Sequence, residues 1–123
     1  MTGIATFSVV ALDCPGPTAL ARSYPAATGW EIDADETEPD RVELRSPGDG
    51  ATIAFQQVAD HRPPVWPGAE HPQQAHLGFS VPDLDAAEDR LPAVGARKNE
   101  VQPGTTFRVH LDPAGHPFCL VLV

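Results

Sequence analysis

His76, Gln56 and Cys119 are the residues whose types and positions could bring ligand-binding chemistry to one face of this protein. Side chains of a β-strand alternate between two faces, and in three expected strands the large apolar residues occupy one of the two alternations. The other alternation carries His76, Gln56 and Cys119, with small residues beside them. We therefore expect these three side chains to line a pocket on the sheet face that no helix covers.

An imidazole, a carboxamide and a thiol could support three kinds of chemistry in such a pocket. His76 could coordinate a divalent metal, hydrogen-bond a ligand, or transfer a proton near neutral pH. A metal centre needs several nitrogen, oxygen or sulfur donors, and His76 with Gln56 or Cys119 offers fewer than such a centre uses. The set favours a pocket without a metal over a divalent-metal site, and no residue is identified as catalytic.

Two tryptophans are further candidates for the pocket lining. Trp66 lies in a proline-rich segment that could hold its ring over a pocket, whereas Trp30 could line the pocket or belong to the core. Cys119 would be a nucleophile only if its pKa were lowered. Because it lies mid-strand between Phe118 and Leu120, we expect a small buried residue there.

The elements that must position these residues repeat along the chain. Residues of the second half match residues of the first half 67 positions earlier, as Pro82 matches Pro15 and Ala86 matches Ala19. Only two copies of so long a unit fit in 123 residues, so the repeat predicts one domain made of two similar modules. The modules cover residues 4–58 and 75–123, and the proline-rich linker 59–74 is expected to be extended and stiff.

Both modules have the predicted order βαβββ. Each begins with a strand, turns at a proline into a helix, and ends that helix at a glycine before three further strands. The expected helices run from Pro17 or Thr18 to about Ala27 and from Asp83 to about Ala93. The expected strands are 4–13, 30–34, 41–46, 51–58, 75–81, 96–101, 106–111 and 117–123. This order predicts an α+β fold in which helices cover one face of each sheet.

The composition excludes several classes of partner. With 17 acidic and 8 basic residues the formal net charge is −9, which argues against nucleic acid and anionic membranes because phosphate binding needs clustered Lys and Arg. Seven carboxylates fall between Glu31 and Glu43, where we expect a solvated surface. Two cysteines make no disulfide framework, and we find neither a signal peptide nor a membrane-spanning run. We therefore expect a cytoplasmic protein.

The order and spacing of several segments resemble the glyoxalase-like proteins of the vicinal-oxygen-chelate (glyoxalase/bleomycin resistance/dioxygenase) superfamily. The segments that carry the resemblance are 12–17 with Tyr24, 29–31, 53–58, 62–67, 72–77, 81–87 and 112–121. The resemblance implies paired βαβββ modules whose curved mixed sheets surround a cleft. It also implies a homodimer.

Enzymatic members of that superfamily hold a divalent metal in the cleft on His, Gln or Glu side chains from the first and last strands of each module. The metal polarises vicinal oxygens of the substrate as a Lewis acid. The resemblance places Val9, Gln56, His76 and Cys119 at these four positions. Val9 has no ligating atom and Cys119 stands where a Glu is expected, so the resemblance supports the fold more than it supports glyoxalase chemistry.

The expected function is binding of a small organic molecule in the cleft between the modules. The expected lining is His76, Gln56, Cys119, Trp66 and Trp30. Two alternatives stay open at this point. The first is a metal-dependent lyase, isomerase or dioxygenase of the same superfamily that uses His76 and other ligands. The second is a resistance protein that sequesters a drug without transforming it.

Overall fold

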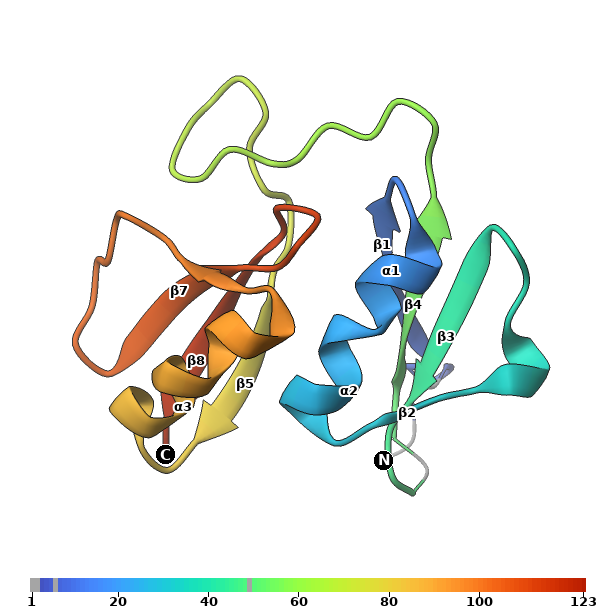
Figure 1. Ribbon diagram of the computed structural model, residues 1–123, viewed down its shortest axis with the longest axis horizontal. Coiled ribbons are helices and arrows are strands. Elements are labelled where there is room, and N and C mark those ends of the chain that lie inside the picture. The colour runs from blue at the N-terminus through green and yellow to red at the C-terminus, as the bar shows by residue number, and fades with distance from the viewer. Residues whose placement is uncertain (1–2, 6, 49) are drawn as a thin grey trace. The chain divides into compact units, whose positions relative to one another are not determined.

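The chain folds into two compact units, residues 1–61 (unit one) and 62–123 (unit two). The computed structural model describes residues 3–5, 7–48 and 50–123, apart from the side chains of Ala26 and Glu36. The boundary between the units falls inside the linker predicted at 59–74, so most of that linker belongs to unit two. Each unit contains one four-stranded mixed sheet and short helices (Figure 1).

Unit one has the predicted order βαβββ. Its elements are β1 (Val9–Cys14), α1 (Pro17–Ala21), α2 (Ser23–Thr28), β2 (Glu31–Ile32), the 3-10 helix η1 (Ala34–Glu36), β3 (Arg41–Arg45) and β4 (Thr52–Gln57). The sheet order is β1-β4-β3-β2, with β1 parallel to β4 and the other pairs antiparallel. Its core joins helix and sheet, as in the contact between the rings of Tyr24 and Phe55, whose centroids are 5.1 Å apart.

Two predictions for unit one were wrong in detail. The strand predicted from Ile4 begins only at Val9, and Ile4 and Phe7 before it are 108% and 70% exposed. The predicted single helix is two helices that meet at Arg22. The cause is Pro25, which has no N–H and whose ring would collide with the carbonyl of Ala21 in a continuous helix. Gly29 ends α2 with a φ of 77°, as predicted.

Unit two repeats the same order. Its elements are β5 (Leu77–Val81), α3 (Leu84–Arg90), the 3-10 helix η2 (Leu91–Val94), β6 (Arg97–Lys98), β7 (Phe107–Leu111) and β8 (Pro117–Leu122). The sheet order is β5-β8-β7-β6, with β5 parallel to β8 and the other pairs antiparallel. The side chain of Asp83 accepts a hydrogen bond from the N–H of Ala86 at 3.1 Å, so it caps α3 as predicted. The α-helix ends at Arg90, before Pro92, rather than near Ala93.

The core of unit two lies between α3, η2 and one face of the sheet. It consists of Leu84, Leu91, Ala96, Phe118 and Leu120, with Leu77, Phe79, Val81, Ala87 and Val94 packed against it. The predicted alternation is therefore confirmed for β5 and for most of β8. Leu122, which the same alternation places on the helix side, is 43% exposed because it lies at the end of its strand.

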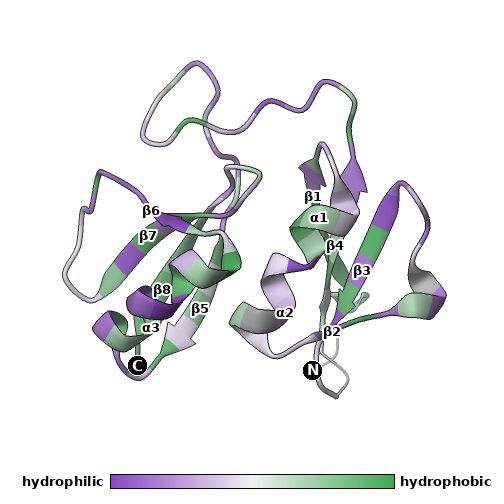
Figure 2. Cartoon of the chain, viewed as in Figure 1, coloured by the Kyte–Doolittle hydropathy of each residue, from purple (hydrophilic) through white to green (hydrophobic). Residues whose placement is uncertain are grey.

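The segment between β4 and β5 is not extended throughout. The N–H of Val65 donates to the carbonyl oxygen of His71 at 2.6 Å, which closes a loop within unit two. The peptide bond between Trp66 and Pro67 is cis. Figure 2 shows this segment as largely hydrophilic with short hydrophobic stretches. The prediction of a stiff spacer was therefore wrong for residues 65–71, which fold back on themselves.

The two sheets with their helices confirm the predicted α+β fold of two βαβββ modules. No helix in the described part of the chain is long and apolar enough to cross a membrane. In the acidic segment from Glu31 to Glu43, Glu43 pairs with Arg41 at 3.1 Å and Asp33 pairs with Arg45 at 3.9 Å.

His110 is a buried titratable residue on the helix side of the sheet of unit two. Its side chain is 1% exposed, and its ring stacks on that of Phe118 at a centroid distance of 5.8 Å. Charged groups face it from α3, β6 and β7. Its Nε2 lies 3.7 Å from Oε1 of Glu88, which also pairs with Lys98, while Arg108 binds the other oxygen of Glu88. Burial lowers the pKa of His110, and the carboxylate of Glu88 opposes that shift.

We expect the lowered pKa of His110 to make the free energy of unfolding depend on pH. The unfolded chain takes up this proton near pH 6.5 and the folded chain only at lower pH, so stability falls as the pH drops below about 6.5. The variant His110→Phe should lose this part of the pH dependence. Urea unfolding of both proteins between pH 8 and pH 5 measures it, and parallel curves would contradict this assignment.

Candidate functional site

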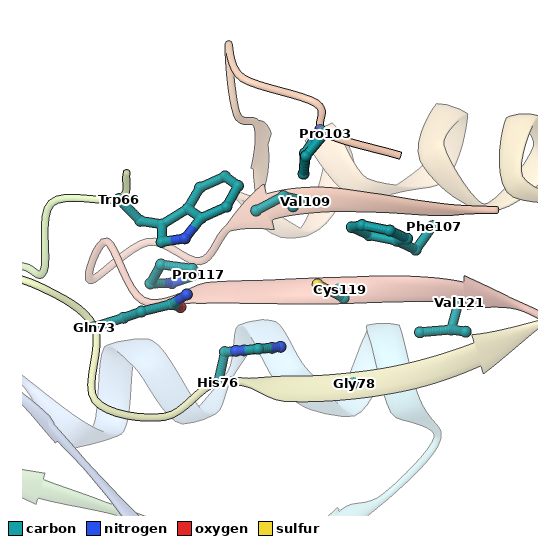
Figure 3. Close-up of a pocket in the computed structure, with 10 residues that line it drawn as sticks. All are labelled: Trp66, Gln73, His76, Gly78, Pro103, Phe107, Val109, Pro117, Cys119 and Val121. Atoms are coloured by element: carbon teal, nitrogen blue, oxygen red, sulfur yellow. The ribbon is translucent and has the colours of Figure 1, made fainter. Parts of the chain in front are cut away.

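An apolar pocket opens on the face of the unit-two sheet that α3 does not cover. Its volume is about 410 Å³, within the range of known small-molecule sites. Ten residues line it, all of them in unit two: Trp66, Gln73, His76, Gly78, Pro103, Phe107, Val109, Pro117, Cys119 and Val121 (Figure 3).

The floor of the pocket is set by the register of three strands. Cys119 on β8 pairs with Gly78 on β5 and with Val109 on β7, so these residues form one row across the sheet. Val121 and Phe107 form the next row. Gly78 leaves the floor open, because a Cβ there would meet only Val121, at 3.9 Å.

The turn between β7 and β8 fixes this register. One carboxylate oxygen of Asp112 accepts hydrogen bonds from the N–H groups of Ala114 and His116, at 2.9 and 3.0 Å. Gly115 has a φ of 90°, and a Cβ at this position would lie 2.6 Å from the Cβ of Pro63. A glycine is therefore required both for the backbone and for the close packing of Pro63. This contact attaches the loop that carries Trp66 to the hairpin.

Three of the five residues predicted from the sequence come together in this pocket. Trp66, His76 and Cys119 all line it, and Figure 3 shows Trp66 near the Pro117 end of β8. Gln56 and Trp30 belong to unit one and are not part of this lining. Gln56 is exposed near the end of β4. Trp30 is half-buried just before β2, and its backbone N–H donates to the hydroxyl of Thr28 at 3.1 Å.

Seven of the ten lining residues lie outside the predicted set, although Gly78, Pro117 and Val121 share the strand alternation that places His76 and Cys119. The positions of Phe107 and Val109 could have been predicted from the alternation of side chains along their strand. Alternation along 106–111, continued through the tight turn at 112–115, places them beside Val121 and Cys119. Gln73 and Pro103 lie in loops, where no periodicity indicates a direction.

The wall next to β7 is held by the side chain of Gln102. Its Oε1 accepts from the N–H of Val109 at 2.9 Å, and its Nε2 donates to the carbonyls of Val109 and Asn99, both at 2.8 Å. Past the end of the short β6, the side-chain amide of Gln102 thus makes hydrogen bonds to β7 of the kind that a neighbouring strand would make. It brings Pro103 to the pocket rim, and Gly104 follows so close to the ring of Phe107 that a Cβ would overlap it.

We expect Gln102→Met to lower the free energy of unfolding by roughly 1–3 kcal/mol, because the N–H of Val109 loses its partner, whereas the carbonyl of Val109 keeps the N–H of Asn99 at 3.0 Å. Gln74→Met, at an exposed position, is the matched control and should change stability by about 0.5 kcal/mol or less. Urea unfolding of the three proteins measures this. Equal stabilities of the two variants would show that Gln102 does not hold the wall.

The polar groups of the pocket do not form a divalent-metal centre. Among the described residues, no three His, Cys, Asp or Glu side chains gather where they could hold a metal ion. Burial raises the pKa of the Cys119 thiol, whereas metal ligation and nucleophilic attack both require the thiolate. Within this pocket His76 and Cys119 thus offer fewer donors than a divalent-metal centre uses.

Comparison with known proteins identifies the family. The glyoxalase-like domain family matches residues 9–121. The chain belongs to this family. It is thereby a member of the vicinal-oxygen-chelate superfamily, and the resemblance expected from the sequence is confirmed. No functionally curated protein matches the chain.

Solved structures of glyoxalase-like proteins share its fold at low sequence identity. A glyoxalase/bleomycin resistance protein/dioxygenase family enzyme from Burkholderia phytofirmans PsJN has a TM-score of 0.71 and 21% identity, over 97% of this chain and 99% of that one. A glyoxalase-related enzyme from Fulvimarina pelagi has a TM-score of 0.69 and 19% identity, over 98% and 89%. A glyoxalase/bleomycin resistance protein from Albidiferax ferrireducens T118 has a TM-score of 0.64 and 23% identity, over 97% and 99%.

Proposed function

We propose that this glyoxalase-like protein binds a small, uncharged aromatic molecule in the pocket of unit two. The observation that carries the proposal is the character of the lining. It combines two aromatic rings, Trp66 and Phe107, with aliphatic side chains, and it contains no Asp, Glu, Lys or Arg. Flat apolar surfaces flanked by a few polar groups are typical of sites for planar organic ligands.

The charge of the protein supports an uncharged ligand. An anion would find no Lys or Arg side chain in the lining, and the net charge of −9 would repel it at a distance. A strongly hydrated cation would have to leave water without a carboxylate to pair with. A neutral ring system instead gains from burial against Trp66, Phe107 and Val109, at about 25 cal/mol for each Å² of apolar surface removed from water.

His76 and Gln73 supply the polar contacts of the proposed site. Figure 3 shows Gln73 beside Pro117 and His76 at the start of β5. His76 is exposed at the pocket edge, where its imidazole could donate or accept one hydrogen bond. A ligand would thus lie with its ring over Cys119 and Val109 and its polar end toward these two residues.

We expect Gly78→Ile to block binding while the protein stays folded. The new side chain would project from the pocket floor into the ligand's place, and a β-branched residue suits a strand at this position. The backbone tolerates it, because Gly78 is not in the left-handed region and its Cβ position is open. Ligand-observed NMR with a panel of neutral bicyclic aromatic compounds measures binding, and Gly78→Ile should weaken it at least about tenfold.

Two further variants make this test specific. Trp66→Ala removes the ring from the pocket and should also weaken binding, whereas His71→Ala, an exposed residue of the same loop outside the lining, should not. Recovery of every compound unchanged supports binding without turnover. Binding that survives Gly78→Ile, or a panel in which no compound binds, would overturn the proposed function.

A further inference from the structure

Gln73 presents a buried hydrogen-bond acceptor without a partner in the pocket wall. Its Oε1 is shielded from water and accepts no hydrogen bond from the residues that the structure describes. Gln73 lies just before β5, and Figure 3 shows its amide group beside Pro117. Burial of a carbonyl oxygen without a donor is costly, because the hydrogen bonds it made with water are not replaced.

The other buried side-chain atoms without a hydrogen bond have different surroundings. In the described part of the chain they belong to Ser46 in unit one and to Glu88 and His110. Glu88 is paired with Lys98 at 3.1 Å, and His110 lies against Glu88 on the helix side of the sheet. None of these three residues lines the pocket. Among these residues, Gln73 alone both lines the candidate binding site and has a buried side-chain atom without a hydrogen bond.

We infer that the ligand of this pocket is a neutral aromatic molecule that carries an O–H or N–H donor, and that this donor bonds to Oε1 of Gln73. The inference rests on the proposed function and narrows its ligand class to phenols, indoles, aryl amines and cyclic amides. The aromatic ring packs against Trp66 and the row of Cys119 and Val109. The donor points toward the start of β5, where Gln73 is.

A site of this kind discriminates by the hydrogen bond that a ligand adds. The acceptor of Gln73 is already without a partner in the free protein, so a ligand with a donor gains a hydrogen bond that a ligand of the same shape without a donor cannot make. The expected difference is about tenfold in Kd. His76 could also bind a donor at the pocket edge, so the role of Gln73 must be separated from that of His76 by substitution.

The test pairs matched ligands with matched variants. The probes are 2-naphthol with 2-methoxynaphthalene, and indole with N-methylindole, because each pair differs in one donor hydrogen and one methyl group. A fifth probe, 2-acetylnaphthalene, carries only an acceptor. Kd values are measured by ligand-observed NMR for the wild-type protein, Gln73→Met, His76→Ala and the control Gln74→Met. Met keeps the length of the Gln73 side chain but removes its oxygen.

In the wild-type protein and in Gln74→Met, 2-naphthol and indole should bind about tenfold more tightly than their methylated partners. The preference should persist in His76→Ala and fall to about twofold or less in Gln73→Met, where the acceptor is gone. A preference that survives Gln73→Met, equal binding within each pair, or tight binding of 2-acetylnaphthalene would overturn the inference and leave the proposed function standing. Failure of all five probes to bind would overturn both.

Discussion

The parallel pairing of β5 with β8 is the constraint on which the rest of unit two depends. Because the side chains of β8 alternate, Phe118 and Leu120 must face α3, and Pro117, Cys119 and Val121 must face the opposite side. One strand thereby forms the core with one alternation and the pocket floor with the other. A shift of one residue would expose the core, so the burial of Phe118 and Leu120 also fixes what the pocket contains.

Local contacts then extend this floor into a pocket. The Asp112 turn sets the register of β7 against β8, and Gly115 allows Pro63 to pack against the hairpin. Gln102 holds the opposite wall through the backbone of Val109. These contacts are formed by loop residues, and they bring Trp66 and Pro103 to the pocket that strand pairing builds around Cys119. The resulting site is apolar with polar groups at one end, which suits binding by burial and one directional hydrogen bond.

The features of the structure that could be predicted from the sequence depend on the alternation of side chains along the strands. The two βαβββ modules, the cap at Asp83, the stop at Gly29 and the faces of β5 all follow from periodicity and turn chemistry. Trp66, His76 and Cys119 line one pocket: His76 and Cys119 follow the strand alternation, and Trp66 lies in a segment rich in prolines. Gln73 and Pro103 could not be found this way, since a loop residue's direction is set by tertiary contacts. The fold-back at 65–71 was missed for the same reason: it depends on one hydrogen bond between Val65 and His71.

The family of this chain explains its fold but not its function. Membership in the glyoxalase-like family accounts for the repeated modules, but the function lies in the side chains that a given chain presents. Here those side chains include one imidazole, one carboxamide and a thiol whose pKa is raised by burial, in a largely apolar surface. The proposed recognition of a ring system uses residues of unit two alone.

The most direct test of this account is to map where a neutral aromatic compound binds. A titration of the 15N-labelled protein with indole, followed by amide chemical shifts, locates the contact residue by residue. The largest chemical-shift changes should occur at Gly78, Val109 and Cys119, the row that forms the pocket floor, and at the side-chain N–H of Trp66. Saturable changes confined to residues 7–61, or none in the row while indole binds, would contradict this account.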